Sequence, residues 1–362
     1  MEQTILTTEQ LLARLPEPLL RWFRASARDL PWRHTADPYR VWVSEIMLQQ
    51  TRVAAVLGYY ARFLAALPTV EALAGAGEDQ LMKLWEGLGY YSRARNLQKA
   101  AKLIAARGRF PDTYQDLLAL PGVGDYTASA IASASFGRRE AAVDGNVLRV
   151  AARLTDCHDD ISDVRTKRSV RAALQEVMPE TPEEIRLFNQ AVMELGALVC
   201  VPNGPPKCAV CPVRDLCLGR LRGTAETLPV KAPKKARRAE EKTVFLLLRQ
   251  GRIALRQRPE TGLLAGLWEF PHVEGALEES AAGAAVQAWG LEPRDWRRKL
   301  AAKHLFTHVE WHMTCYLLEV SGEGPEGFSW VDGPGLAAHA VPSAFARCCK
   351  EARRVLAEAA SD

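Results

Sequence analysis

The chain has 362 residues, of which 48% are hydrophobic, and this length predicts two or three domains with cores of their own. It has no apolar run of the roughly eighteen residues that a membrane helix needs, and its first segment, MEQTILTTEQLLARL, has no apolar signal core. The formal net charge of +4 equals that of the stretch Lys231 to Lys242, which holds six Lys or Arg and two Glu, so the rest of the chain sums to zero.

Residues 9–222 are predicted to form helix after helix, because apolar residues recur at helical spacing and no long strand pattern interrupts them. The predicted helices are Gln10–Ser26, Tyr39–Gln49, Val53–Leu67, Val70–Ala74, Gln80–Leu88, Ser92–Ala106, Tyr114–Ala119, Tyr126–Ser135, Asn146–Arg153, Arg165–Val177 and Ile185–Leu195.

Residues 225–241 break this periodicity, since they are rich in Pro and Lys. We interpret them as a linker between a helical region at 1–224 and a domain at 242–362. Their basic run is typical of a solvated linker, and nucleic-acid contact is the second interpretation. The last domain is predicted to be α+β, with a hairpin at Gln250-Gly251. Its elements are strands Thr243–Arg249, Ile253–Gln257, Val309–Val320 and Gly327–Val331, and helices Glu278–Trp289 and Ser343–Ala360.

Four of the eight cysteines fall close together at Cys200, Cys208, Cys211 and Cys217, with the spacing C-x7-C-x2-C-x5-C. Thiols this dense in a long chain are typical of metal ligands rather than disulfides, and without an export signal they predict a reducing cytoplasm. Four thiolates suit a structural zinc ion or a [4Fe–4S] cluster, and the thiols alone do not choose between them. Unrelated buried cysteines are the alternative, disfavoured because Cys208 and Cys211 form a chelating pair.

A short turn, Leu120-Pro121-Gly122-Val123-Gly124, stands between two predicted helices. Two glycines around one small apolar residue leave backbone amides open, and with the start of the next helix these amides suit a phosphate oxygen. The pattern is typical of a helix–hairpin–helix, which holds a DNA backbone without reading bases. An ordinary αα-hairpin, which also favours Gly, is the alternative.

Two carboxylates are candidates for chemistry. Glu45 lies among apolar residues, which should raise its pKa and keep it protonated near neutral pH; a structural Glu is the alternative. Asp144 stands at a predicted helix start, where Asp is a common cap. It follows the glycine-rich turn by one helix, a position that faces the DNA groove in helix–hairpin–helix enzymes.

The chain resembles the adenine DNA glycosylases of the MutY family, within the endonuclease III superfamily. The resemblance covers residues 10–220 densely and extends to a Nudix-like carboxyl-terminal domain. It is carried by Leu30-Pro31-Trp32-Arg33, Val43-Ser44-Glu45 through Gln50-Thr51, Gly87-Leu88-Gly89-Tyr90-Tyr91, Leu120 through Tyr126, Val143-Asp144-Gly145-Asn146, Glu194-Leu195-Gly196-Ala197, the cysteines, Gly266 through Pro271 and Phe306-Thr307-His308.

The resemblance implies a role for each matching residue. Glu45 matches the acid that protonates adenine at N7, and Asp144 matches the carboxylate that stabilises an oxocarbenium-like sugar. Tyr126 and Asn146 match positions at that site. The remaining matches are Trp32, Arg33 and Glu194 around the flipped adenine; Gln49 and Tyr90 as wedges in the duplex; Gln50, Thr51, Leu88, Gly122, Val123 and Gly124 as DNA contacts; and Phe306, Thr307 and His308 as the loop that inspects 8-oxoguanine.

The resemblance also implies the cofactor and the partner. The cysteines would hold a [4Fe–4S] cluster rather than zinc, and the partner would be double-stranded DNA with an A:8-oxoguanine or A:G mispair. We expect a monomer in the cytoplasm, nucleoid-associated if the source is bacterial. Superfamily members that also cut the strand carry a Schiff-base Lys after the glycine-rich turn. Here Asp125, Tyr126 and Thr127 follow Gly124, which predicts a monofunctional glycosylase.

The chain departs from the family in two places. Seven residues rather than six separate Cys200 from Cys208, and Thr307 stands where many relatives have Ser. The Nudix-like domain lacks the Arg-Glu-x-x-Glu-Glu array that binds magnesium, so we interpret it as a lesion reader and not as a pyrophosphatase. Two other readings stay open: a glycosylase/lyase for oxidised pyrimidines, and a non-catalytic DNA-binding protein with a structural metal.

Overall fold

The computed structural model describes residues 7–233 and 236–359, and the chain divides into two compact units. The first unit comprises residues 1–75 and 95–233, and the second comprises 76–94 and 234–362. The division after residue 233 falls inside the predicted linker at 225–241. The grouping of residues 76–94 with the second unit has no counterpart in the sequence pattern. Among the described residues, no helix is both long and apolar enough to cross a bilayer.

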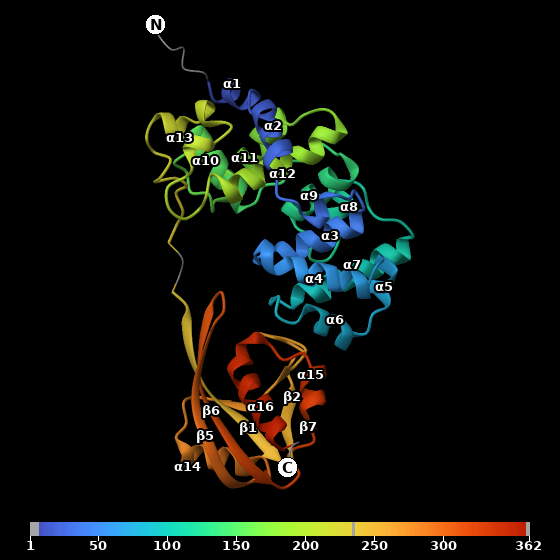
Figure 1. Cartoon of the computed structure of the whole chain (residues 1–362), viewed down its shortest axis with the longest axis vertical. Helices are drawn as coiled ribbons and strands as arrows, with labels where there is room; N and C mark the ends of the chain where they lie inside the picture. Colours follow the sequence, from blue (N-terminus) through green and yellow to red (C-terminus); the bar gives the residue numbers. More distant parts are fainter. Residues whose placement is uncertain (1–6, 234–235, 360–362) are drawn as a thin grey trace. The chain divides into compact units, whose positions relative to one another are not determined.

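The amino-terminal part of the chain is helical, as predicted (Figure 1). Its elements are α1 Thr8–Ala13, α2 Pro16–Ser26, the 3₁₀ turn η1 Pro31–Arg33, α3 Pro38–Leu48, α4 Val53–Ala66, α5 Val70–Gly75, α6 Glu78–Trp85, α7 Ser92–Arg107, α8 Tyr114–Leu118, α9 Asp125–Phe136, α10 Gly145–Thr155, α11 Val164–Val177, α12 Pro182–Leu198, η2 Cys208–Val210, η3 Arg214–Leu216 and α13 Leu218–Leu221.

One helix prediction is wrong in this part. The sequence predicts a single helix over Gln10–Ser26, but the structure has two, α1 and α2. Pro16 occupies the first turn of α2, where it lacks the amide that a continuous helix would need, and the chain therefore restarts there.

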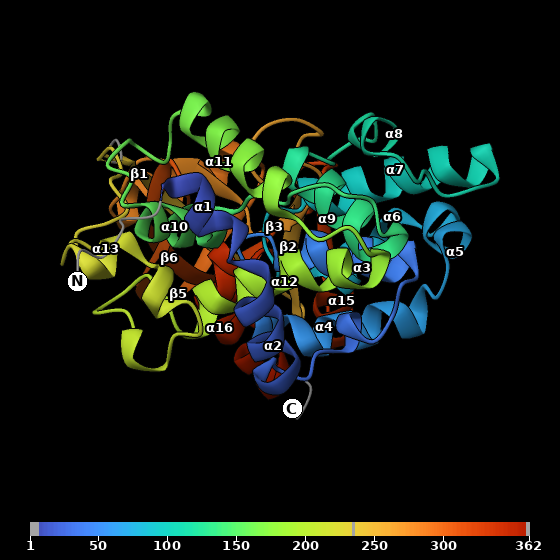
Figure 2. The same cartoon turned by 90° about the horizontal axis from the view of Figure 1, so that it is seen from above.

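Helices α9 and α12 position the other elements of the first unit. Helix α9 packs against α3, α8 and α12, and α12 also packs against α2 and α10, which lie beside it in both views (Figures 1 and 2). Most of α9, from Thr127 to Ser135, is buried, and its small Ala and Ser side chains let neighbours approach closely. Gly196 of α12 faces α10 so closely that a Cβ there would lie 2.8 Å from Cβ of Asn146.

The second unit contains a seven-stranded mixed sheet with the central order β3-β2-β1-β6-β5, to which β4 and β7 add by pairing with β1 and β2. Strands β1 and β6 run parallel over most of their length, whereas β5 and β6 form a long antiparallel hairpin. The strands are β1 Arg238–Arg249, β2 Arg252–Gln257, β3 Trp268–Glu269, β4 His272–Glu274, β5 Glu292–Leu305, β6 Val309–Ser321 and β7 Phe328–Val331; the helices are α14 Glu279–Ala288, α15 Gly333–Ala338, η4 Ser343–Phe345 and α16 Ala346–Ala359.

Both faces of this sheet are covered. Alternate residues of β1 point to opposite sides, so Leu246 joins a core with Cys348 of α16 while Leu247 joins a core with Val286 of α14. Burial on both faces explains the uninterrupted apolar run in this strand. The α+β prediction for this part of the chain is confirmed.

The sequence does not predict strand β5. Half of its residues, EPRDWRRKLAAKHL, are charged and most are exposed, because the strand lies at the edge of the sheet, so no clear apolar alternation marks it. Strand β1 also begins at Arg238, inside the predicted linker, because its first residues pair with β6, Arg238 opposite Val309.

Candidate active site

Glu45 and Tyr126 meet although they lie 81 residues apart in the sequence. Helix α3 begins at the pair Asp37-Pro38, where the Asp37 side chain accepts from the amide of Tyr39, and it carries Glu45 two turns further on. The hydroxyl of Tyr126, in the first turn of α9, donates to Oε2 of Glu45 at 2.8 Å. The packing of α3 on α9 therefore creates this pair.

Burial raises the pKa of Glu45 to about 7. The hydrogen bond from Tyr126 and the charge of Arg33 act in the opposite direction, whereas the nearby carboxylate of Asp144 raises the pKa further. A carboxyl group with this pKa is protonated in about half of the molecules at neutral pH, which suits a general acid. The raised pKa expected from the apolar neighbours of Glu45 is thus present, and its cause is the tertiary burial.

Asp144 caps helix α10 and belongs to the same site. One of its oxygens accepts from the amide of Val147 and the other from Nδ2 of Asn146, both at 2.8 Å. Burial raises the pKa of Asp144, and these two hydrogen bonds oppose the rise. Since Asp144 accepts two donors and Glu45 accepts one, Asp144 is the carboxyl group that ionises first.

The segment before Asp144 has no regular structure, and side-chain amides hold it. The carboxamide of the buried Asn189, on α12, accepts from the amide of Ala142 at 3.1 Å and donates to the carbonyl of Glu140 at 2.8 Å. Gln175 of α11 accepts from the amide of Ala141 at 2.8 Å. These contacts replace the partners that a strand would supply and fix the approach to Asp144.

Glu194, on α12, anchors two arginines. Its carboxylate accepts from Arg28 at 2.6 Å and from Arg33 at 2.7 Å. Burial opposes ionisation, but the two guanidinium groups outweigh it and lower the pKa of Glu194 to about 2. Trp32, next to Arg33, is buried and packs edge-on against Tyr60, with ring centroids 5.3 Å apart. The sequence indicates Trp32, Arg33 and Glu194 but not Arg28.

Arg149, also absent from the sequence-based prediction, connects Asp144 to the cysteine segment. Its guanidinium donates to Oδ1 of Asn146 and to the carbonyls of Gly196 and Cys200, each at 2.9 Å. Asn146 in turn donates to Asp144. A signal was available in the sequence, since two arginines four residues apart, Arg149 and Arg153, stand in an otherwise apolar stretch of one helix. Both are buried in the structure.

The four clustered cysteines line one cavity at the end of the first unit, together with Arg153 and basic residues that include Lys207 and Arg220. Arg153 donates to Sγ of Cys200 at 3.3 Å, and Sγ of Cys217 donates to the carbonyl of Arg153 at 3.2 Å. None of these four cysteines forms a disulfide. In the part of the chain that the structure describes, no three Cys, His, Asp or Glu side chains are arranged to hold a single metal ion.

The glycine-rich turn joins α8 to α9 as predicted. Gly122 has φ of +76°, and a Cβ there would lie 2.7 Å from Cβ of Asn96, so only glycine fits. Gly124 forms the N-cap of α9, and a Cβ there would meet nothing within 4 Å. Val123 is buried, and its amide donates to the carbonyl of Leu120 at 3.1 Å, which closes the turn.

One predicted DNA contact, Gln50, and one predicted wedge residue, Tyr90, lie in unusual backbone conformations. Gln50 has φ of +62° and Tyr90 has φ of +49°, a region that residues other than glycine rarely adopt. Tyr90 is 49% exposed, whereas Leu88 is buried and its carbonyl accepts from Arg93.

Two other predicted DNA contacts lie beside Gln50. Nε2 of Gln49 is 3.3 Å from the hydroxyl oxygen of Thr127 on α9, and the Thr51 hydroxyl donates to the carbonyl of Gln49. The Gln49 side chain is therefore tied to α9, and the Thr51 side chain to the end of α3.

The Phe306-Thr307-His308 segment forms the tip of the β5–β6 hairpin in the second unit. The tip is closed by a hydrogen bond from the amide of Phe306 to the carbonyl of Val309 at 2.8 Å. The hydroxyl groups of Thr307 and Tyr90, both in the second unit, lie 2.7 Å apart. The structure thus pairs a predicted lesion-reading residue with a predicted wedge.

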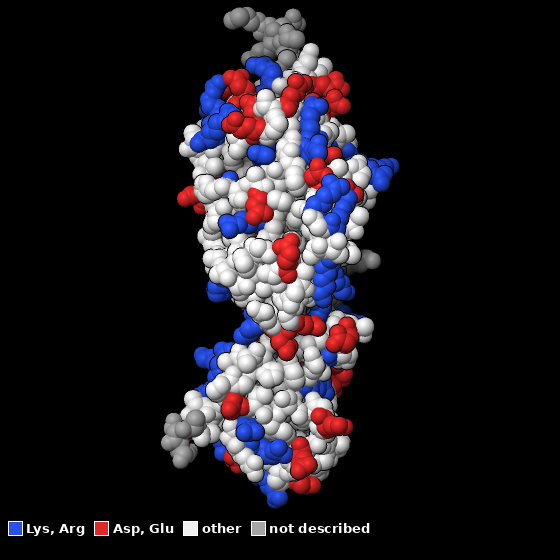
Figure 3. Space-filling model, turned by 90° about the vertical axis from the view of Figure 1, so that its right-hand side faces the viewer, with Lys and Arg blue, Asp and Glu red and all other residues white. Residues whose placement is uncertain are grey.

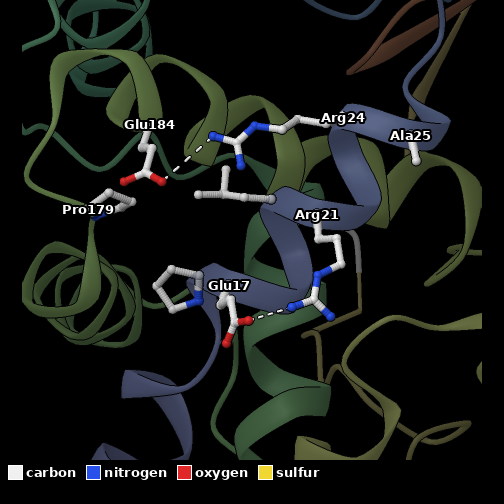
Figure 4. Close-up of a pocket in the computed structure, with 8 residues that line it drawn as sticks. Glu17, Arg21, Arg24, Ala25, Pro179 and Glu184 are labelled. Carbon is white, nitrogen blue, oxygen red and sulfur yellow. Dashed lines mark hydrogen bonds and ion pairs between the residues drawn. The ribbon is translucent and has the colours of Figure 1, made fainter.

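A separate surface pocket of about 640 Å³ lies against α2 and the start of α12 (Figure 4). Its charged residues are paired with one another, Glu17 with Arg21 and Arg24 with Glu184. None of the predicted site residues line it, and we assign it no role.

Comparison with known proteins first shows the class of protein to which this chain belongs. Residues 43–180 match the model of the HhH-GPD superfamily of base-excision DNA repair proteins, and residues 243–351 match a NUDIX domain. The solved structure of a thermostable thymine-DNA glycosylase is 27% identical, with a TM-score of 0.53, over 59% of this chain and 99% of that one. An endonuclease III–DNA complex, 24% identical with a TM-score of 0.51, shares the fold.

Relatives that match most of this chain identify the family within that class. A human adenine DNA glycosylase is 37% identical over 85% of this chain and 67% of its own length, and one from Buchnera aphidicola is 32% identical over 83% and 84%. The chain therefore belongs to the MutY family of adenine DNA glycosylases, DNA-binding enzymes of base-excision repair that hydrolyse N-glycosyl bonds. The expected family and fold class are confirmed.

The hydrogen bond between Tyr126 and Glu45 generates a pH prediction. Replacing Tyr126 by Phe removes a donor that stabilises the carboxylate, so the pKa of Glu45 should rise above about 7. Glu45 then stays protonated to higher pH, so the alkaline limb of the profile of single-turnover rate against pH should shift to higher pH. Tyr39→Phe, which removes a buried hydroxyl bonded to the Leu67 carbonyl, is the matched control and should leave the limb in place. A limb that stays or moves to lower pH in the Tyr126 variant contradicts the assignment.

The Arg149 bridge generates a second prediction. Arg149→Lys keeps the charge but loses the planar fork, and we expect base release to slow by about ten-fold, as for other supporting-residue losses. Asn146→Ala breaks the same bridge at its other end. The measured single-turnover rate of the double variant, Arg149→Lys with Asn146→Ala, should be only slightly lower than the rate of either single variant. Fully additive losses would show that the two residues act separately.

Proposed function

We propose that this enzyme removes adenine paired with 8-oxoguanine or guanine in double-stranded DNA, as a monomer and without strand cleavage. The observation that carries the chemistry is the single site formed by Glu45, Tyr126 and Asp144. It combines a carboxyl group with a pKa of about 7 and a second one stabilised in its ionised form.

These two carboxyl groups have different roles in breaking an N-glycosyl bond. Protonated Glu45 donates to N7 of adenine, so the base leaves as a neutral molecule. Ionised Asp144 stabilises the positive charge that develops on the sugar, by electrostatics or by transient covalent attachment. Water then completes the hydrolysis. Tyr126 holds Glu45 in place, and Asn146 and the Val147 amide hold Asp144.

The proposed adenine contacts are Trp32, Arg33 and Glu194. Because Glu194 binds both Arg28 and Arg33, its role is to orient the arginines as much as to meet the base. One turn before it on α12, the amide oxygen of Gln190 is buried without a hydrogen-bond partner among the described residues. An unpaired acceptor is costly, and the exocyclic amine of adenine would satisfy it.

DNA would be held chiefly through its backbone. The turn of Gly122, Val123 and Gly124 suits a phosphate through the amides of its two glycines, because the Val123 amide already donates to Leu120. Extrusion of the base requires wedges such as Gln49 and Tyr90, with Gln50, Thr51 and Leu88 at their turns. On the face shown in Figure 3, Lys and Arg are interspersed with Asp and Glu instead of forming one basic field.

Thr307 is the proposed reader of the lesion. 8-Oxoguanine differs from guanine in carrying a donor at N7 and an acceptor at O8. Thr307 has a hydroxyl that can accept, and its amide has no acceptor among the described residues. A hydroxyl and a free amide on one residue match that donor–acceptor pair, with Phe306 and His308 as its supports. The threonine methyl leaves both groups in place.

The four cysteines are proposed to hold a [4Fe–4S] cluster. They line one cavity together, and four thiolates suit such a cluster. The extra residue before Cys208 is absorbed by an irregular loop that the amide of Lys207 closes through the carbonyl of Val199 at 3.0 Å. When bound, the cluster would tie together a segment whose Lys207, Arg214 and Arg220 can meet phosphates.

The Nudix-like domain is proposed to read DNA and not to hydrolyse a pyrophosphate. Helix α14, ESAAGAAVQA, provides a single carboxylate, Glu279, and the preceding Glu278 is paired with Lys299. Magnesium-dependent phosphate chemistry needs several carboxylates together.

The cluster proposal predicts a spectroscopic result. Protein purified without oxidation should be brown, with broad visible absorption and about four irons per chain. Cys211→Ser should lose that absorption, whereas Cys157→Ser, a free cysteine outside the cavity, should keep it. One zinc per chain without visible absorption would contradict the cluster.

The proposed function predicts which base pairs the enzyme accepts as substrates. Duplexes with A:8-oxoguanine, A:G and A:T are incubated with the enzyme and free adenine is measured. Adenine should leave the first two and not the third, because only they carry the purine partner that the proposal requires. Glu45→Gln should bind the A:8-oxoguanine duplex but release no adenine, because an amide cannot supply the proton.

Three outcomes would contradict the proposal. Equal release from A:T would remove the mispair specificity, and release by Glu45→Gln would remove the acid assignment. Strand cleavage without added base, as fast as adenine release, would show a lyase despite the absence of Lys at Tyr126 and its neighbours.

A further inference from the structure

Aromatic packing supports the hairpin tip that carries Thr307. Its Phe306 ring packs edge-on against Trp311, with centroids 4.8 Å apart, and against His304 at 4.6 Å. Trp311 is 2% exposed, and its indole nitrogen donates to Glu240 at 2.9 Å. The base of the tip is therefore rigid, because its aromatic ring rests on a buried and hydrogen-bonded platform.

The peptide groups on either side of Thr307 are held by a different segment. Nε of Arg237 donates to the carbonyl of Phe306 at 2.8 Å, and the amide of Arg238 donates to the carbonyl of His308 at 3.1 Å. Both donors lie where the chain enters β1, about seventy residues before the tip in sequence. The parallel pairing of β1 with β6 brings them there, as Figure 1 shows for the two strands.

The first of these contacts has a direct geometric effect. The carbonyl of Phe306 and the amide of Thr307 belong to one planar peptide group, in which they point in opposite directions. A donor that fixes the carbonyl therefore aims the amide away from β1, out of the tip. That amide has no acceptor among the described residues, so its direction decides what it can bind.

We infer that Arg237 is a positioning residue for lesion recognition: it fixes the Phe306–Thr307 peptide group so that the amide and hydroxyl of Thr307 are presented together to 8-oxoguanine. The inference rests on the proposed lesion-reading role of Thr307. Arg237 belongs to the basic run that the sequence indicates as a linker, and its role is to shape the tip instead of attracting phosphate.

Substitutions at Arg237 separate its hydrogen bond from its charge. In Arg237→Gln, Nε2 sits at the same position along the side chain as Nε of arginine, so the donor is kept and the charge is lost. In Arg237→Lys, a carbon occupies that position, so the charge is kept and the donor is displaced. Arg237→Ala loses both. Arg238→Ala is the matched control, since the side chain of Arg238 bonds Glu240 while its backbone amide, which holds the tip, remains.

The measured quantity is the ratio of single-turnover adenine release from A:8-oxoguanine to release from A:G. We expect Arg237→Ala and Arg237→Lys to lower this ratio about three- to ten-fold, the factor that one hydrogen bond contributes. Arg237→Gln and Arg238→Ala should stay within about two-fold of the unchanged enzyme by the same reasoning. The A:G rate and the melting temperature should not change, which a general loss of structure would alter.

The outcomes distinguish this inference from the function on which it rests. A ratio of one in the unchanged enzyme would overturn lesion reading and, with it, the role of Arg237. A ratio above one that Arg237→Ala leaves unaltered would overturn only the role of Arg237. Equal losses in Arg237→Ala, Arg237→Gln and Arg238→Ala would assign the effect to charge and also overturn the positioning role.

Discussion

Two carboxyl groups in one desolvated site impose the constraint around which the first unit is built. Burial disfavours the charged form of both Glu45 and Asp144, and the charge of Asp144 further raises the pKa of Glu45. The structure separates them by unequal hydrogen bonding, with one donor for Glu45 and two for Asp144. That inequality distinguishes two similar side chains, and it depends on the packing of α3 on α9 and of α10 on α12.

The backbone around these groups is held by side chains from elsewhere in the fold. Asn189 supports the irregular segment before Asp144, and Arg149 connects Asn146 to the carbonyls of Gly196 and Cys200. In the second unit, Arg237 holds the peptide group next to Thr307 in the same manner. Irregular segments can present reactive groups, but without a ladder of their own they depend on such long-range donors and acceptors.

The helical organisation was predictable because its signals are local. Apolar periodicity, the pair Asp37-Pro38 and the glycine-rich turn each act within a few residues, and the helices follow in the predicted order. The prediction failed where a local signal was missing or was misread. Pro16 divides a pattern that reads as one helix, and strand β5 has a charged sequence because its outer edge meets solvent.

The sequence by itself determined which residue types are available: two carboxylates, a tyrosine where a lyase would have lysine, four grouped cysteines and the Phe306-Thr307-His308 segment. These are covalent facts, and their resemblance to the MutY family indicates a glycosylase. Only the tertiary structure decided how Glu45 is protonated, which donors Asp144 accepts, and that Arg149 and Arg237 hold the groups they serve. The protonation state of a carboxyl group and the direction in which a peptide group points depend on burial and on partners that are distant in sequence. No local sequence pattern encodes them.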